Sequence, residues 1–379
     1  MNDILQLTLI LAGSLLATVI SKRLHIPAVI GQMLIGVILA PSVLGWIHGG
    51  HTIEVMSEIG VILLMFLAGL ESDLNMLKRY FKASMLVAIS GVVAPLLLFG
   101  AAAHFLGYGF NVSLFYGIVF AATSVSITVE VLQEYGKLNT RAGNIILGAA
   151  VVDDILAVLI LSVFTSTSGA ESGDGNLLIK GILTLVFFAF LILVHKFIPK
   201  VWKFVDKLPI FAKNTTMAIL ICLGLSLLAD AVGMSAVIGS FFAGIAISQT
   251  EPSRQIEEFV SAIGYVVFIP VFFVSIAISI SFKSLVEHPL LILFFVLLAV
   301  LTKLLPAYYT ARASHLDTTE SLLVGTGMIS RGEMALIVAQ IGLSSKLITD
   351  GVYSELVIVI LLSTLIAPFL IKLALRSEK

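Results

Sequence analysis

Long apolar segments separated by short polar ones run along the whole chain of 379 residues. A membrane-spanning helix needs about 17–25 predominantly apolar residues, and thirteen segments reach that length. They are residues 4–21, 27–46, 52–70, 83–106, 112–134, 141–167, 176–195, 214–230, 233–249, 258–280, 286–311, 318–343 and 352–374. Transmembrane β-strands would instead give alternating segments of about ten residues. The pattern therefore predicts an all-α polytopic membrane protein with about thirteen transmembrane helices.

The lysines and arginines favour one orientation of these spans. Positive residues concentrate in the cytoplasmic loops of membrane proteins. With the N-terminus outside, 17 of the 22 lysines and arginines fall on the inner side, three on the outer side and two within spans. A wrong span count would scramble this alternation. We therefore expect the N-terminus outside and the C-terminus in the cytoplasm.

The composition agrees with a lipid environment. Hydrophobic residues make up 59% of the chain and charged residues 12%, with a mean hydropathy of +1.11, whereas soluble domains carry about 25% charged residues. A net charge of −1 gives no reason to expect a nucleic-acid partner. The single cysteine, Cys222, excludes an internal disulfide framework. The N-terminal apolar segment lacks a basic region and a cleavage site, so we expect a retained first span rather than a signal peptide.

A short apolar pattern occurs twice in the chain. The sequence Ala-Val-Ile-Gly starting at Ala28 recurs at Ala236, an offset of 208, and Ile-Gly starting at Ile59 recurs at Ile263, an offset of 204. This offset equals seven spans, and because seven is odd the second copy runs through the membrane in the opposite direction. Inverted repeats are typical of transporters, whose ion site lies near the midplane where the copies meet. The predicted organisation is repeat one at 1–170, a linker helix at 171–212 and repeat two at 213–379.

Five ionisable residues lie deep within the apolar spans. They are Asp153, Asp154, Lys303, Arg331 and Glu333. Each costs about 2.5–3.5 kcal/mol on insertion, so each needs a reason. One alternative is a structural cluster in which the cations neutralise the carboxylates. Adjacent buried carboxylates cannot easily both stay ionised, however, so one of them can bind a proton near physiological pH. A hard cation such as Na+ prefers the same oxygen ligands, and competition between the two would couple their fluxes.

Small and hydroxyl residues interrupt two spans at corresponding places of the repeats. The first interruption contains Thr123 and Ser124, and the repeat offset carries these positions onto Gly327 and Met328. Such segments are typical of broken helices whose exposed backbone groups surround an ion site. The alternative is that small residues only allow close helix packing. Their symmetric placement beside the carboxylate helix favours broken helices.

Four motifs carry a resemblance to a known family. They are Met65–Glu71, Ala122–Ser124, Val151–Leu156 and Gly327–Glu333. In these motifs and over nearly the whole chain, the sequence resembles the bacterial Na+/H+ antiporters of the cation:proton antiporter 2 family, the NapA-like group. The resemblance implies one exchanger membrane domain over residues 1–379, with interleaved ion-translocation and dimerisation subdomains and two crossing broken helices. It also implies no cytosolic regulatory domain.

The resemblance also implies roles for the site residues. Asp154 would bind the transported Na+ and the proton, and Asp153 would pair with Lys303 and exchange partners during transport. Thr123, Ser124, Gly327 and Met328 would form the crossover of the broken helices. Arg331 and Glu333 would be structural or would modulate the crossover.

For activity, the resemblance implies a secondary active transporter and not an enzyme. It would need no cofactor and would act as a homodimer in the bacterial inner membrane, with a role in pH homeostasis. An Asp-Asp pair goes with electrogenic exchange of Na+ or Li+ for protons. A K+/H+ antiporter and a Na+-coupled symporter of the same architecture stay open. A cation channel is disfavoured because no Thr-Val-Gly-Tyr-Gly filter is present, and an intramembrane aspartyl protease would need its two aspartates on different helices.

Overall fold

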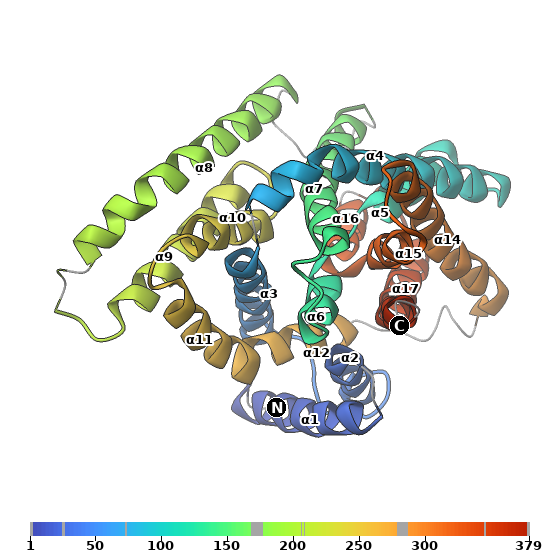
Figure 1. The fold of residues 1–379 in the computed structure, drawn as a ribbon. Helices are drawn as coiled ribbons and strands as arrows, with labels where there is room; N and C mark the ends of the chain where they lie inside the picture. Colours follow the sequence, from blue (N-terminus) through green and yellow to red (C-terminus); the bar gives the residue numbers. More distant parts are fainter. Residues whose placement is uncertain are drawn as a thin grey trace. The chain divides into compact units, whose positions relative to one another are not determined.

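The computed structural model describes residues 3–24, 27–72, 74–167, 177–205, 207, 209–278, 287–344 and 346–376. Within these ranges the ordered elements are all helices, and no strand occurs (Figure 1). The all-α fold class is therefore confirmed. The first part of the expected linker, residues 171–176, and the ends of the predicted spans 258–280 and 286–311 lie partly outside these ranges.

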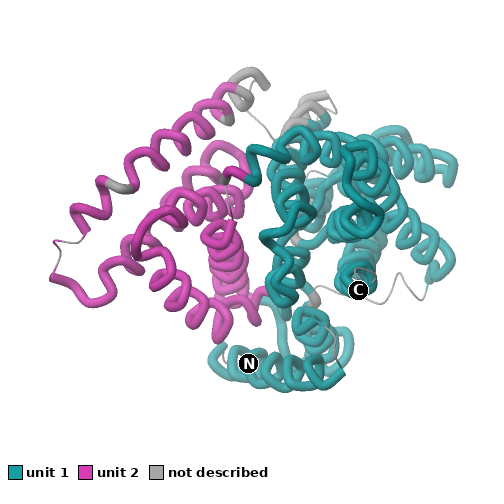
Figure 2. The backbone as a smooth tube through the Cα atoms, in the orientation of Figure 1, with its two compact units in different colours: residues 1–49, 76–174, 273–379 teal, residues 50–75, 175–272 magenta. Residues whose placement is uncertain are grey.

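The chain divides into two compact units, coloured separately in Figure 2. Unit 1 consists of residues 1–49, 76–174 and 273–379, and unit 2 of residues 50–75 and 175–272. The helices of unit 1 are α1 (Asp3–Arg23), α2 (Ala28–Leu39), α4 (Leu74–Phe105), α5 (Phe110–Ala121), α6 (Ser126–Glu134), α7 (Arg141–Thr167), α14 (Pro289–Ala313), α15 (Thr318–Gly327), α16 (Gly332–Ser344) and α17 (Asp350–Arg376). The helices of unit 2 are α3 (His51–Glu71), α8 (Leu177–Val205), α9 (Lys213–Ala231), α10 (Ala236–Ser248), α11 (Ser253–Ile263) and a π-helical turn η1 (Gly264–Phe268). Helix α12 (Ile269–Ile278) crosses the boundary between the units, and α4 begins two residues before unit 1 resumes at Met76.

Most of these helices follow the predicted spans. Helix α7 has the bounds expected of the span 141–167, and eight stretches of the described chain are long and apolar enough to cross a membrane. Shorter apolar helices include α2, α10 and part of α16. The total of thirteen spans stays a prediction. Large apolar side chains such as Leu15 and Leu97 are 66% and 63% exposed, which suits a protein whose surface meets lipid.

The predicted span 27–46 is longer than the helix found there. Helix α2 ends at Leu39, and Ala40 has a ψ of 160°, which is extended backbone. Pro41 follows, and the residue before a proline is pushed out of the helical region. The chain then turns back, and the amides of Trp46 and Ile47 donate hydrogen bonds to the Leu39 carbonyl. Hydrophobicity alone therefore placed the end of this helix too late.

Close backbone contacts hold unit 2 together. Helix α10 packs against α3 and α9. A Cβ atom on Gly69 of α3 would collide with the Phe241 carbonyl of α10, and one on Gly244 of α10 would collide with the Phe66 carbonyl of α3. Small residues of this kind let two membrane helices approach at backbone distance. The pair Gly69 and Gly244 therefore fixes how α3 packs on α10.

Replacing Gly69 with alanine is expected to destabilise unit 2 by about 1–3 kcal/mol, because the added methyl group forces the two backbones apart. Thermal unfolding of the purified protein in detergent measures this as a lower midpoint. The matched control is Gly224→Ala in α9, where no atom lies within 4 Å of the added Cβ. A control midpoint that falls as far as that of Gly69→Ala would contradict the packing argument.

In unit 1 several helices pack around α17. Helix α17 contacts α14, α15, α16, α5 and α6, and α15 also contacts α7 and α14. Helix α15 begins with a capping box in which the Asp317 side chain accepts from the Glu320 amide and the Glu320 side chain accepts from the Asp317 amide. This pairing satisfies amides that have no partner inside the helix. A hydrogen bond between the segment that joins α5 to α6 and the segment that joins α15 to α16 brings the ends of these short helices together.

Candidate functional site

The first predicted interruption is a break between α5 and α6. Helix α5 ends at Ala121, Ala122 adopts extended backbone with a ψ of 143°, and α6 begins at Ser126. Thr123 and Ser124 lie in the break, where both side chains are buried. A break exposes backbone carbonyls and amides that need partners, since lipid supplies none.

The second break lies between α15 and α16. Helix α15 continues through Gly327, so the irregular segment runs from Met328 to Arg331, slightly later than the sequence pattern suggested. Gly332 follows with a φ of +47°, a conformation that favours glycine. A Cβ atom on Gly332 would also lie 2.5 Å from the Cβ and Oγ of Ser124. Gly332 therefore permits both the turn and the close approach of the two breaks.

The two breaks are joined by direct hydrogen bonds. The Ser124 amide donates to the Ser330 carbonyl at 3.0 Å. The Thr128 hydroxyl donates to the Gly327 carbonyl at 2.7 Å, and the Gly332 amide donates to the Thr364 hydroxyl of α17 at 3.0 Å. These bonds satisfy backbone groups that the helix breaks leave unpaired. The breaks thus form one hydrogen-bonded unit inside unit 1.

A buried ion pair lies beside the first break. Lys303 Nζ of α14 is 3.1 Å from Asp153 Oδ2 of α7, and both side chains are fully buried. The Thr123 hydroxyl donates to the same carboxylate oxygen at 2.5 Å. Lys303 also donates to the Ala121 carbonyl, the last residue of α5, at 2.9 Å. The lysine therefore links α7 to the C-terminal end of the short helix α5. The partial negative charge at a helix C-terminus favours a cation there.

Arg331 adds a second buried cation to this cluster. Its Nη2 donates to the Ala299 carbonyl at 2.8 Å, and its guanidinium lies 6.0 Å from the ring centroid of Phe120. Among the described residues, Arg331 Nε and Nη1 and Asp153 Oδ1 have no hydrogen-bond partner. Buried polar atoms without partners are costly. The cluster therefore holds spare donors and a spare acceptor that can take new partners when side chains rearrange.

Asp154 differs from Asp153 in its environment. It is half-buried, whereas Asp153 is only 1% exposed. Consecutive residues of a helix point about 100° apart, so the two carboxylates do not share one direction. The side chain of Glu333 lies outside the described part of the structure. The arrangement separates a paired, enclosed carboxylate from a more accessible one.

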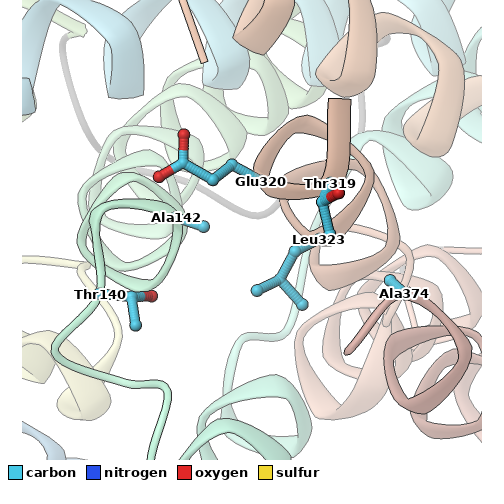
Figure 3. Close-up of a pocket in the computed structure, with 6 residues that line it drawn as sticks. All are labelled: Thr140, Ala142, Thr319, Glu320, Leu323 and Ala374. Carbon is cyan, nitrogen blue, oxygen red and sulfur yellow. The ribbon is translucent and has the colours of Figure 1, made fainter. Parts of the chain in front are cut away.

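A small cavity lies elsewhere in unit 1, near the first turns of α7 and α15 (Figure 3). Its volume is about 20 Å³, and its lining includes Ala142, Glu320 and Leu323. That space suits a single water molecule. Arg141 and Glu320 form an ion pair of 3.6 Å at this end of the helices. Because Arg141 precedes Asp153 by twelve residues, about 18 Å along a helix, this cavity is not the carboxylate site.

The structure brings most of the expected site residues together and adds others. Thr123, Asp153 and Lys303 are in direct contact. Sequence reasoning missed the Ala121 carbonyl as a lysine partner, and it missed the role of Thr364. The first is a backbone group and the second lies in a separate helix, so no local motif indicates either one.

Comparisons with known proteins agree with this fold. A family model described as "Sodium/hydrogen exchanger, transmembrane" matches residues 9–377. The Na(+)/H(+) antiporter of Enterococcus hirae is 48% identical over 368 residues, covering 97% of this chain and 96% of the relative. The Na(+)/H(+)-K(+) antiporter GerN of Bacillus cereus is 39% identical, covering 97% of this chain and 95% of the relative.

A solved structure supports the same conclusion for the fold. The sodium proton antiporter MjNhaP1 from Methanocaldococcus jannaschii at pH 8 matches with a TM-score of 0.65 at 19% identity, covering 98% of this chain and 97% of that one. The family match extends over nearly the whole chain, and two relatives exceed 30% identity over 95% or more of their own length. The chain therefore belongs to the sodium/hydrogen exchanger family, and it is a multi-pass membrane antiporter and not an enzyme.

Proposed function

We propose that this antiporter exchanges Na+ or Li+ for protons electrogenically by alternating access, and that the cation and the proton compete for Asp154. The proposal rests on one observation, the different environments of the two adjacent carboxylates. Asp153 is enclosed and paired with Lys303 at 3.1 Å, while Asp154 is half-buried. An accessible carboxylate beside broken-helix oxygens suits a small hard cation. The antiport named for both relatives supports the choice of Na+ and H+.

The pairing of Asp153 supports an exchange of partners during the cycle. Lys303 holds Asp153 when the cation is absent from Asp154. When the cation arrives, Asp153 can turn toward it and release Lys303, whose remaining partner is the Ala121 carbonyl. If Asp154 gives up one proton and the released Lys303 ammonium gives up another for each cation that binds, every cycle moves net charge across the membrane. The spare donors of Arg331 can stabilise the carboxylate during this rearrangement.

The proposal includes the organisation inferred from the sequence. The N-terminus is outside and the C-terminus cytoplasmic, as the distribution of lysine and arginine favours. The two repeats are inverted around the linker helix, and the protein acts as a homodimer in the bacterial inner membrane. These features follow from the charge pattern, from the repeat and from the family resemblance.

Inside-out vesicles that hold an acidic interior test the function. Addition of NaCl or LiCl is expected to dissipate the pH gradient, read from a fluorescent pH probe, while choline chloride leaves it intact. KCl is added in a parallel sample to measure tolerance of K+. If no monovalent cation dissipates the gradient, antiport is ruled out.

Charge movement is tested in proteoliposomes with a membrane potential set by K+ and valinomycin. Electrogenic exchange is expected to run faster when the potential favours the movement of the extra proton. An exchange rate that does not respond to the potential would leave Na+/H+ exchange standing and would refute the electrogenic mechanism.

A further inference from the structure

A buried carboxylate with two tyrosine partners lies away from the ion pair. Glu355 of α17 is only 9% exposed. The hydroxyls of Tyr108 and Tyr116 both donate to its Oε2 atom, each at 2.7 Å. We call these three residues the Glu355 cluster. A charged side chain inside a membrane helix is costly and needs a reason, and the proposed transport cycle does not use this one.

The cluster connects two helices of unit 1 that hold the crossover. Tyr116 lies in α5, and Glu355 lies in α17. Tyr108 belongs to the loop before α5. Burial, together with the neighbouring Glu355 carboxylate, raises the pKa of the Tyr108 phenol above its usual value. The hydroxyl of Tyr108 therefore stays protonated and remains a donor at neutral pH.

A stack of aromatic rings leads from this cluster toward the ion pair. The ring centroids of Tyr116 and Phe295 are 5.2 Å apart, those of Phe295 and Phe99 are 5.7 Å apart, and those of Phe99 and Phe120 are 4.0 Å apart. All four side chains are fully buried. Arg331 lies over the last ring, that of Phe120. Offset-stacked rings in a dense core transmit a shift of one member to the next.

The half-helix α5 carries two members of this stack and ends at the ion pair. Tyr116 and Phe120 are four residues apart and lie on one face of α5. Ala121, whose carbonyl accepts from Lys303, is five residues after Tyr116, or about 7–8 Å along the helix. Thr123 lies two residues after Ala121 and donates to Asp153. The position of α5 therefore determines the position of two partners of the ion pair.

We propose that Glu355 and Tyr116 are positioning residues for ion exchange, because their hydrogen bond holds α5 in the register that keeps the Ala121 carbonyl and the Thr123 hydroxyl around Lys303 and Asp153. This inference rests on the proposed function of the Asp153 and Asp154 site. Neither residue touches the transported ion. Their loss therefore changes how well the site binds rather than removing the site.

The test compares two tyrosines that bond to the same oxygen. Tyr116→Phe removes the bond from α5, and Tyr108→Phe removes the bond from the loop. Na+/H+ exchange is measured in proteoliposomes across Na+ concentration and pH, with rates normalised to the amount of inserted protein. Tyr116→Phe is expected to raise the half-saturating Na+ concentration about 3- to 10-fold, the effect of losing about one hydrogen bond, and to shift the pH profile. Its maximal rate stays within about twofold, and Tyr108→Phe stays within about twofold in both quantities.

Two variants of the carboxylate complete the test. Glu355→Gln keeps an acceptor oxygen for both hydroxyls and is expected to behave like the unaltered chain. Glu355→Leu removes the acceptor and is expected to match Tyr116→Phe; should it fail to insert, Tyr116→Phe carries the comparison. A merely structural role would lower the protein yield or the maximal rate and leave half-saturation and the pH profile in place.

The outcomes separate the two proposals. An unaltered half-saturating Na+ concentration in Tyr116→Phe, or an equal rise in Tyr108→Phe, overturns the positioning role while the proposed function stands. Absence of exchange by the unaltered chain overturns the proposed function, and the positioning role falls with it.

Discussion

Asp154→Asn is expected to abolish Na+-driven proton movement, down to the level of vesicles that lack the protein. The amide cannot release a proton or carry the negative charge that balances a cation, so both competing ligands lose their site. The matched variant Asp153→Asn keeps the accessible carboxylate and removes only the partner of Lys303. We expect it to retain exchange at a reduced rate. Dissipation of the pH gradient in inside-out vesicles measures both.

An exposed acid provides the control for this experiment. Asp230 near the end of α9 is exposed, so Asp230→Asn removes a carboxylate at no expected cost to transport. Equal amounts of the three variants in the membrane are verified by immunoblot. Exchange that survives in Asp154→Asn would refute the assignment of the binding site, and loss of exchange in Asp153→Asn alone would transfer that role to Asp153.

Lys303→Gln is expected to cause a large loss of stability in unit 1. Lys303 is fully buried, and its removal leaves the Asp153 charge enclosed without its cation. Breaking a buried ion pair in this way costs about 3–5 kcal/mol. The unfolding midpoint of the purified protein in detergent is expected to fall accordingly. Lys196→Gln on the exposed side of α8 serves as the control.

A second substitution tests whether the loss comes from the unpaired charge. The double variant Asp153→Asn with Lys303→Gln replaces the ion pair with two neutral amides, and both can still hydrogen-bond. Replacing both partners of a buried pair is far less costly than removing one. We therefore expect the double variant to be more stable than Lys303→Gln alone. Equal midpoints for the two would show that the pair does not interact across the helices.

Helix positions were largely predictable from the sequence, because each span must bury its backbone in lipid with an apolar surface. The bounds of α7 follow directly from its apolar run between Arg141 and the polar residues around Thr167. The predicted end of α2 was wrong because the apolar run continues past Pro41. The proline ends the helix for a steric reason, which hydrophobicity does not reveal. Local backbone chemistry decides where a helix ends, and an average over many residues conceals it.

That one of the two aspartates pairs with Lys303 was also predictable, since a membrane span rarely tolerates a lone charge. The choice of Asp153 came from the family resemblance. The glycine at position 332 was not predictable as a requirement, because it is needed to make room for Ser124, which lies in another segment of the chain. The same holds for the Glu355 cluster. Its tyrosines look like ordinary apolar positions of α5 and its loop, and their meaning depends on a helix more than two hundred residues later.

The bond between the Ser124 amide and the Ser330 carbonyl uses main-chain atoms on both sides. A mutation at position 124 or 330 can therefore change the side chain and leave this hydrogen bond intact, as long as Gly332 leaves room for the residue at position 124. The crossover can therefore persist through evolutionary divergence while the hydroxyl groups around it are exchanged for others. We expect relatives with different ion preferences to share this main-chain hydrogen bond and to differ in the side chains beside it.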